Sequence, residues 1–197
     1  MKHAPANLSW AGLAVAATFC AMSGAASAES ATYIVEPTHT FVTWEAKHFG
    51  TSTSHGRFDK KSGTINLDKV AKTGKVELTI DMASMNTGVA PLDKHLTGED
   101  FFNAAKFPEA KFVGTTFIFD GDKVTSVAGS LTLHGKTNPV VLKATAYGCY
   151  ENPYIKSEVC GGDFETTITR SQYDISYGVP GIPDNIRLLI QIEAIKQ

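Results

Sequence analysis

The sequence has no surplus of positive charge, because its 18 Lys and Arg residues stand against 20 Asp and Glu residues. The Lys and Arg residues also form no cluster along the chain. Nucleic-acid-binding domains carry a basic excess that is gathered on one face or one helix. We therefore expect no nucleic-acid partner.

Catalytic and cofactor motifs are also missing. The Gly-x-Ser-x-Gly elbow of hydrolases does not occur. Gly161-Gly162 lacks the Lys-Ser/Thr pair that follows a phosphate-binding loop. His48, His55, His95 and His134 include no pair with the close spacing of a metal site. We expect no catalytic residues, no metal and no cofactor, and predict that the protein is not an enzyme.

Long apolar runs are scarce, and the main one lies at the N-terminus. Residues 10–22 are apolar, but a membrane span needs roughly 20 residues. Lys2 precedes this run, and Ala26-Ser27-Ala28 offers the small residues of a cleavage site. We predict a cleaved signal peptide at residues 1–28, a periplasmic location, no transmembrane segment and one domain at residues 29–197. No linker-like tract or internal repeat divides that domain.

Cysteine is rare, and only Cys149 and Cys160 lie beyond the predicted signal peptide. An even pair in an oxidising compartment favours a disulfide. The spacing is not the Cys-x-x-Cys of redox motifs. We predict that the two residues are joined as a structural crosslink.

Most of the chain alternates apolar and polar residues, as strands with one buried face do. Such stretches lie at residues 33–35, 41–48, 55–58, 64–67, 75–82, 111–119, 124–133, 139–147, 163–170 and 185–195, and from them we predict about eight antiparallel strands. Asp120-Gly121 is typical of a hairpin turn. A closed barrel removes the exposed edges of an open sheet, so we favour an all-β, eight-stranded antiparallel barrel. A two-sheet sandwich is the alternative.

One stretch, at about residues 89–107, does not alternate. Pro91 suits the first turn of a helix. Thr97-Gly98-Glu99-Asp100 has the form of a capping box, which would start a second short helical turn. We predict a short helical insert of two turns that covers one end of the barrel.

The predicted inner faces mix large and small side chains. Eight strands enclose an interior that is either just filled or able to hold one slender ligand. Small residues leave volume that a close-packed protein would ordinarily fill. Tapering barrels also alternate small and large residues, so the pattern leaves a ligand-filled lumen and a packed one both open. The small inner residues include Ala46, Gly129, Ala144, Ala146, Thr166 and Ala194.

Several segments of the chain form a recognisable series, namely VTWEAKHFG at 42–50, HGRF at 55–58, DKHL at 93–96, DFF at 100–102, KFPEAKF at 106–112, GSLTLHG at 129–135 and the closing residues 188–195. Together they resemble the YceI-like family of secreted polyisoprenoid-binding proteins. They occur in the family's order and cover essentially the whole mature chain. The resemblance implies a lipocalin-like barrel whose long lumen holds an isoprenoid or similar amphiphilic chain.

The ligand site is expected on the inner faces and the insert. His95 and Asp93 would lie either at the barrel mouth beside a lipid head group or on the insert surface. Arg57, Arg170 and Arg187 are either contacts for an anionic head group or surface residues. The predicted ligand-binding residues are Val42, Trp44, Ala46, His48, Leu78, Ile80, Asp93, His95, Phe101, Leu131, Leu142, Ala144, Phe164 and Ile190.

From these features we predict a secreted binding protein that holds one amphiphilic lipid chain, as a carrier, a store or a sequestering protein. The alternatives are a ligand-free interaction or stress-response module, and a small lipid-modifying enzyme. The sequence is compatible with a homodimer and does not fix the oligomeric state.

Overall fold

The computed structural model describes residues 1–3 and 30–197. Beyond residue 3, the predicted signal peptide lies outside the described residues. The strands are β1 (Ala31–Val35), β2 (Phe41–His48), β3 (Ser52–Phe58), β4 (Lys61–Asp68), β5 (Thr73–Asp81), β6 (Met85–Asn86), β7 (Glu109–Asp120), β8 (Lys123–Leu133), β9 (Lys136–Asn152), β10 (Ser157–Thr169) and β11 (Asn185–Lys196). Helices in the described part are α1 (Ala90–Leu96) and the 3-10 turns η1 (Met82–Ser84) and η2 (Arg170–Tyr173).

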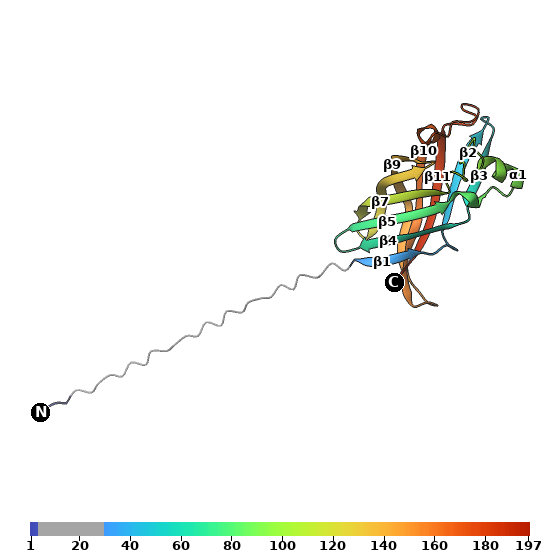
Figure 1. Ribbon diagram of the computed structural model, residues 1–197. Helices are drawn as coiled ribbons and strands as arrows, with labels where there is room; N and C mark the ends of the chain where they lie inside the picture. The colour runs from blue at the N-terminus through green and yellow to red at the C-terminus, as the bar shows by residue number, and fades with distance from the viewer. Residues whose placement is uncertain (4–29) are drawn as a thin grey trace.

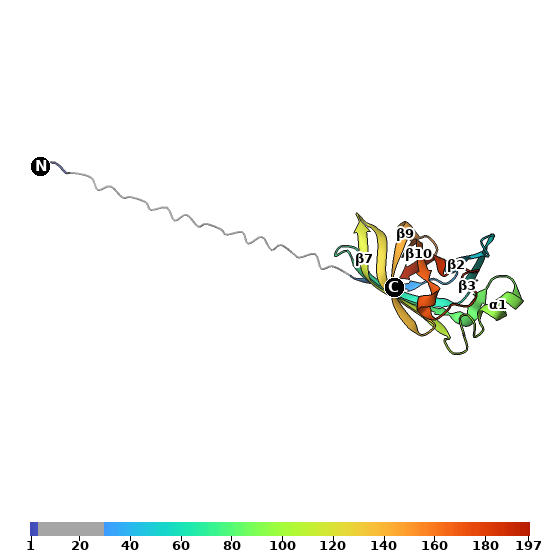
Figure 2. The ribbon, with the colours of Figure 1, turned by 90° about the horizontal axis from the view of Figure 1, so that it is seen from above.

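The strands close into a barrel, which confirms the predicted fold (Figures 1 and 2). Hydrogen bonding follows the order β1-β4-β5-β7-β8-β9-β10-β11, and β11 pairs back onto β1 to complete a ring of eight. All of these pairings are antiparallel. Closure leaves the ring without an exposed edge along this seam.

The long strand β11 holds two separate strands on the same side. Its C-terminal half pairs with β1, where Ile34 lies opposite Ile195, and its N-terminal half pairs with β2, where Val42 lies opposite Ile190. The strands β1 and β2 therefore share one position in the barrel and are separated by the corner at residues 36–40. Their partners β4 and β3 are divided in the same way. The result is a barrel longer than a single short strand could line.

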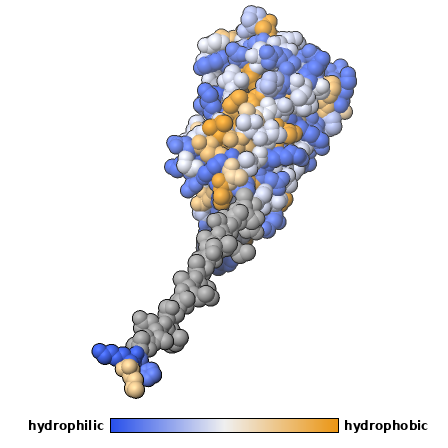
Figure 3. All heavy atoms as spheres, turned by 90° about the vertical axis from the view of Figure 1, so that its left-hand side faces the viewer, coloured by the Kyte–Doolittle hydropathy of each residue, from blue (hydrophilic) through white to orange (hydrophobic). Residues whose placement is uncertain are grey.

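Alternation places the apolar faces inside, as predicted for most strands. Val42, Trp44 and Ala46 on β2 are buried, as are the apolar residues at every second position of β5. Figure 3 shows the outside of one face, where apolar side chains are interspersed among hydrophilic ones. Within the described residues, no helix has both the length and the apolar character that a bilayer crossing requires.

The predicted inner position of Ala146 is wrong. The register between β9 and β10 shifts because Asp163 pairs with Ala146 while the next residue, Phe164, pairs with Ala144. This bulge leaves Thr145 without an opposite residue and reverses the alternation beyond it. Tyr147 consequently packs against the core, whereas Ala146 is exposed.

The insert contains one helix where two turns were predicted. Pro91 lies in the first turn of α1, as expected. Thr97, however, is the C-cap residue of this helix. Its backbone N–H still donates to the carbonyl oxygen of Asp93 at 3.0 Å, whereas the next N–H, of Gly98, donates to the carbonyl oxygen of His95 at 3.1 Å, so the last turn tightens and the helix ends. No second helix follows in the described chain before β7, and residues 97–107 form irregular turns.

The predicted disulfide is present between Cys149 and Cys160, which lie opposite each other on β9 and β10. Closing a chain loop of this size restricts the unfolded state by about 3 kcal/mol. We expect a Cys149→Ser/Cys160→Ser variant to lose about this much free energy of unfolding in urea titrations. Thiol titration of the unreduced, unfolded protein without residues 1–28 should find none; two reactive thiols would contradict the pairing.

In the corner at residues 36–40, Glu36 should make a contribution to the free energy of unfolding that depends on pH. Burial alone would raise the pKa of Glu36, but hydrogen bonds from Thr38 and His39 outweigh it and lower the pKa from 4.5 to about 2. Because the pKa of Glu36 is lower in the folded protein than in the unfolded chain, its ionised carboxylate stabilises the fold at a pH above the unfolded pKa of about 4.5. This contribution is lost as the pH falls through the folded pKa of about 2.

We expect Glu36→Gln to lower the free energy of unfolding by about 1–2 kcal/mol at pH 7 and by much less at pH 2, where about half of the Glu36 carboxyl groups are protonated in the folded protein. Urea titrations at both pH values measure this. The exposed Glu151 offers a matched control in Glu151→Gln, which should be neutral. An equal loss at both pH values would contradict the assignment.

Candidate functional site

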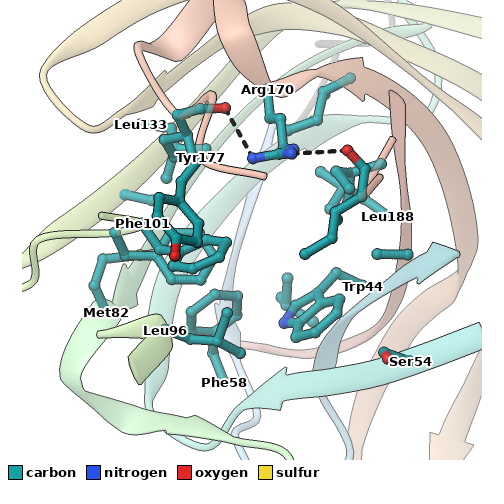
Figure 4. Close-up of a pocket in the computed structure, with 18 of the residues that line it drawn as sticks. Trp44, Ser54, Phe58, Met82, Leu96, Phe101, Leu133, Arg170, Tyr177 and Leu188 are labelled. Carbon is teal, nitrogen blue, oxygen red and sulfur yellow. Dashed lines mark hydrogen bonds between the residues drawn. The ribbon is translucent and has the colours of Figure 1, made fainter. Parts of the chain in front are cut away.

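A cavity of about 260 Å³ lies at the end of the barrel that carries β2, β3 and α1. Strands from both sides of the barrel, the insert and the loop between η2 and β11 all contribute to its wall, which is predominantly apolar (Figure 4). One water molecule needs only about 10–15 Å³ of such space, so the cavity is large enough for a larger guest. Eight of the predicted ligand-binding residues line it: Val42, Trp44, Ala46, His48, Ile80, His95, Phe101 and Leu131.

A second cavity, of about 60 Å³, lies in the half of the barrel that contains β1 and the disulfide. Its lining includes Tyr33, Cys160 and Ala194. Four more predicted residues line this space: Leu78, Leu142, Phe164 and Ile190. The structure thus distributes the predicted wall residues over two apolar spaces in one lumen.

Two predicted ligand contacts, Asp93 and Ala144, are not among the residues that line either cavity. The Asp93 carboxylate accepts hydrogen bonds from the backbone N–H and the Oγ1 of Thr87, both at 2.6 Å. Asp93 therefore ties the insert to the chain that precedes it. Ala144 is half-buried beside the bulge and packs against the apolar core.

Trp44 forms a flat part of the wall because its neighbour on β3 has no side chain. A Cβ atom on Gly56 would lie 2.5 Å from the indole ring. The Trp44 Nε1–H meets the sulfur of Met85 at 3.4 Å, so the one polar group of this ring is partnered away from solvent. Gly56 thus makes room for the largest side chain of the lumen.

The insert closes its end of the barrel with aromatic contacts. The ring of Phe101 lies 5.0 Å from that of His95 and 5.3 Å from that of Tyr177, in the loop before β11. Phe102 meets Phe58 of β3 edge to face at 5.7 Å. Such pairs are favourable beyond the area that they bury. The insert and the loop therefore cover the cavity together.

Arg170 is the buried charge of this cavity, with 5% of its surface exposed. Its Nε, Nη1 and Nη2 groups donate to the carbonyl oxygens of Pro183, Ile175 and Ile182, at 3.0, 3.2 and 3.0 Å, respectively. Burial lowers the pKa of Arg170, and the charge of Asp184 opposes that shift. The guanidinium holds the loop in place while it faces the lumen (Figure 4).

The other two candidate arginines lie on the outside of the barrel. Arg187 donates to carboxylate oxygens of Glu45 and Glu165, at 3.0 Å and 2.6 Å, and about half of its side chain is exposed. Arg57 pairs with Asp59 at 2.8 Å. The sequence left open whether Arg57 and Arg187 contact a head group or lie on the surface, and these contacts favour the surface.

Sequence reasoning missed the part of the wall that lies outside regular strands. Ile175, Tyr177 and Ile182 come from the loop before β11, where no periodic pattern marks a buried residue. Ser54 and Met82 also line the cavity. The alternation along residues 75–82 places Met82 on the inner face, so this residue could have been added to the predicted site. Ser54 could not, because its stretch is typical of a polar turn.

The described residues contain one group with ligand atoms close enough to hold a metal, formed by Cys149, Glu158 and Cys160. Its two sulfur atoms are already joined in the disulfide. None of the candidate histidines belongs to this group. His134 instead uses its Nδ1 to contact the carbonyl oxygen of Tyr173 at 3.0 Å.

Comparisons with known proteins agree with this architecture. The family model described as YceI-like domain matches residues 33–194. The UPF0312 protein of Pseudomonas fluorescens strain SBW25 is 35% identical over 188 residues, which cover 94% of this chain and 97% of that protein. The solved YCEI protein of Campylobacter jejuni is 29% identical, with a TM-score of 0.66, over 77% of this chain and 90% of that one.

A polyisoprenoid binding domain from Saccharophagus degradans, described as implicated in plant cell wall breakdown, has a TM-score of 0.60. The match covers 86% of this chain and 100% of that domain, at 14% identity. At this identity the likeness shows a shared fold.

The close approach of Gly56 to Trp44 predicts a strong effect of one added methyl group. We expect Gly56→Ala to lower the free energy of unfolding by about 1–3 kcal/mol, because the indole must move. The tryptophan emission should shift to longer wavelength as the ring leaves its buried position. Gly148→Ala is the matched control, since a Cβ atom there meets nothing within 4 Å. Equal urea midpoints for the two variants would contradict this account of the wall.

Proposed function

Because the chain belongs to the YceI-like domain family, we propose that it binds one amphiphilic lipid, with an isoprenoid chain as the favoured class. The apolar cavity of about 260 Å³ beside Trp44 is the observation that carries this proposal. The protein from Saccharophagus degradans that shares this fold is a polyisoprenoid binding domain, which supports the choice of an isoprenoid.

The energetics suit a hydrocarbon tail. Each CH₂ group that leaves water contributes roughly 0.8 kcal/mol, so a long chain binds well without a dedicated polar motif. The two cavities lie along one lumen and are lined mainly by apolar side chains. A chain that enters beside the insert would extend toward the second cavity.

We further propose that the protein acts in the periplasm as a carrier, store or sequestering protein, on the basis of the predicted signal peptide. The ligand-free module is disfavoured by the volume inside the barrel, since interiors are ordinarily packed without such spaces. A homodimer stays a prediction.

Native mass spectrometry of the purified protein, followed by lipid extraction, tests the binding proposal. We expect a co-purifying lipid, or uptake of an isoprenoid alcohol by the delipidated protein. A protein that carries no lipid and takes up no isoprenoid or quinone analogue contradicts the proposal.

Filling the cavity should abolish binding without unfolding the protein. Ala46 is buried and lines the first cavity, so Ala46→Phe places a ring where the tail would lie. We expect at least a tenfold loss of isoprenoid affinity, about 1.4 kcal/mol. Ala146→Phe on the outer face of β9 is the matched control and should bind as the wild type does. Equal affinity in the two variants would place the ligand elsewhere.

A further inference from the structure

We infer that Arg170 selects the head group of the bound lipid, and that this head group is an oxyanion, a phosphate or a carboxylate. This inference rests on the proposed function, because it assigns the polar end of a ligand whose tail fills the lumen. It names the residue that would contact the head group and the chemical class of that head group, neither of which an apolar wall specifies.

The first observation is the sign of the charges around the first cavity. The ionisable residues in its lining include Lys47, His48, His95 and Arg170. No Asp or Glu occurs among the described residues that line it. A cavity whose lining holds the cations of Lys47 and Arg170 and no carboxylate favours an anionic guest over a cationic one.

The second observation is that Arg170 has no carboxylate partner. Within the described part of the chain, no acidic side chain forms an ion pair with it. The nearby Asp184 accepts hydrogen bonds from the backbone N–H and the Oγ of Ser171, at 2.8 Å and 2.6 Å. Buried charges are ordinarily paired, because an isolated one is costly to remove from water.

The third observation concerns hydrogen-bond capacity. A guanidinium carries five N–H donors, and three of those of Arg170 are used by the carbonyl oxygens of Ile175, Ile182 and Pro183. One N–H on each terminal nitrogen is left for another acceptor. Two such donors on one planar fork match the two oxygens of a carboxylate or phosphate.

A purely structural role does not account for all of this. Carbonyl oxygens are neutral, so the three bonds that fasten the loop place no anion in direct contact with Arg170, and the charge of Asp184 acts on it without an ion pair. The guanidinium also lies at a wall of the pocket, with Tyr177 and Leu133 on one side and Leu188 on the other (Figure 4). An oxyanion in the cavity would supply both the counter-charge and the missing acceptor.

The placement also sets the direction of the ligand. Lys47, His48 and His95 are exposed residues of the covered end, and Arg170 lies at the same end of the lumen. The second cavity, at the other end, is almost wholly apolar. The head group would therefore stay beside the insert while the tail points toward the disulfide.

The test compares ligands that share one tail and differ only in the head. Delipidated wild-type protein is titrated with geranylgeranyl phosphate, geranylgeranoic acid, geranylgeraniol and geranylgeranylamine, and displacement of the neutral dye Nile red reports binding. We expect at least one oxyanion to bind about tenfold or more tightly than the alcohol, and the amine to bind most weakly. A gain for phosphate alone or carboxylate alone identifies which oxyanion is selected.

The variants then assign the effect to one residue. Arg170→Gln should reduce the advantage of the oxyanion over the alcohol to within about twofold, while Arg170→Lys should retain most of it. Arg187→Gln, at an exposed arginine on the outer face, is the matched control and should keep the wild-type preference. An unchanged preference in folded Arg170→Gln overturns the assignment.

The two proposals fail in different ways. If the wild type binds all four heads equally, or the amine most tightly, the inference about Arg170 is wrong while lipid binding stands. If none of the four ligands binds, the proposed function itself fails. The wild-type series decides the matter even if a variant at Arg170 does not fold.

Discussion

The structure depends on the closure of one sheet through the long strand β11. This strand pairs along one side with β10 and along the other with both β1 and β2. If that seam were open, the apolar inner faces of the strands would meet water, and their burial would no longer stabilise the fold. Closure therefore creates the lumen and sets its length.

The two ends of this lumen differ because different elements finish them. At one end the insert and the loop before β11 are held together by aromatic contacts between Phe101 and Tyr177, and the loop is fastened by Arg170. At the other end the barrel is crosslinked by the disulfide. The larger cavity lies at the end where Arg170 holds the loop. Arg170 is also the only buried charged residue among the described residues that line the two cavities.

Strict alternation made the barrel and most of its wall predictable from the sequence, as Val42, Trp44, Leu78 and Ile190 illustrate. The failures occur where local backbone geometry interrupts the pattern. A bulge in β9 turned Ala146 outward, and the chain leaves α1 at its C-cap Thr97 in irregular turns where a second helical turn was predicted. The chemistry of arginine made Arg170 a candidate head-group contact. Its burial could not be predicted, because it depends on carbonyl oxygens from a loop that has no periodic pattern.

The central claim is that this barrel encloses an apolar chain beside Trp44. A crystal structure of the protein purified from its native host, without delipidation, tests it most directly. We expect continuous elongated density that begins near Arg170, passes Trp44 and runs along the lumen. Separate water molecules in the larger cavity, or a cavity closed by repacked side chains, would contradict it.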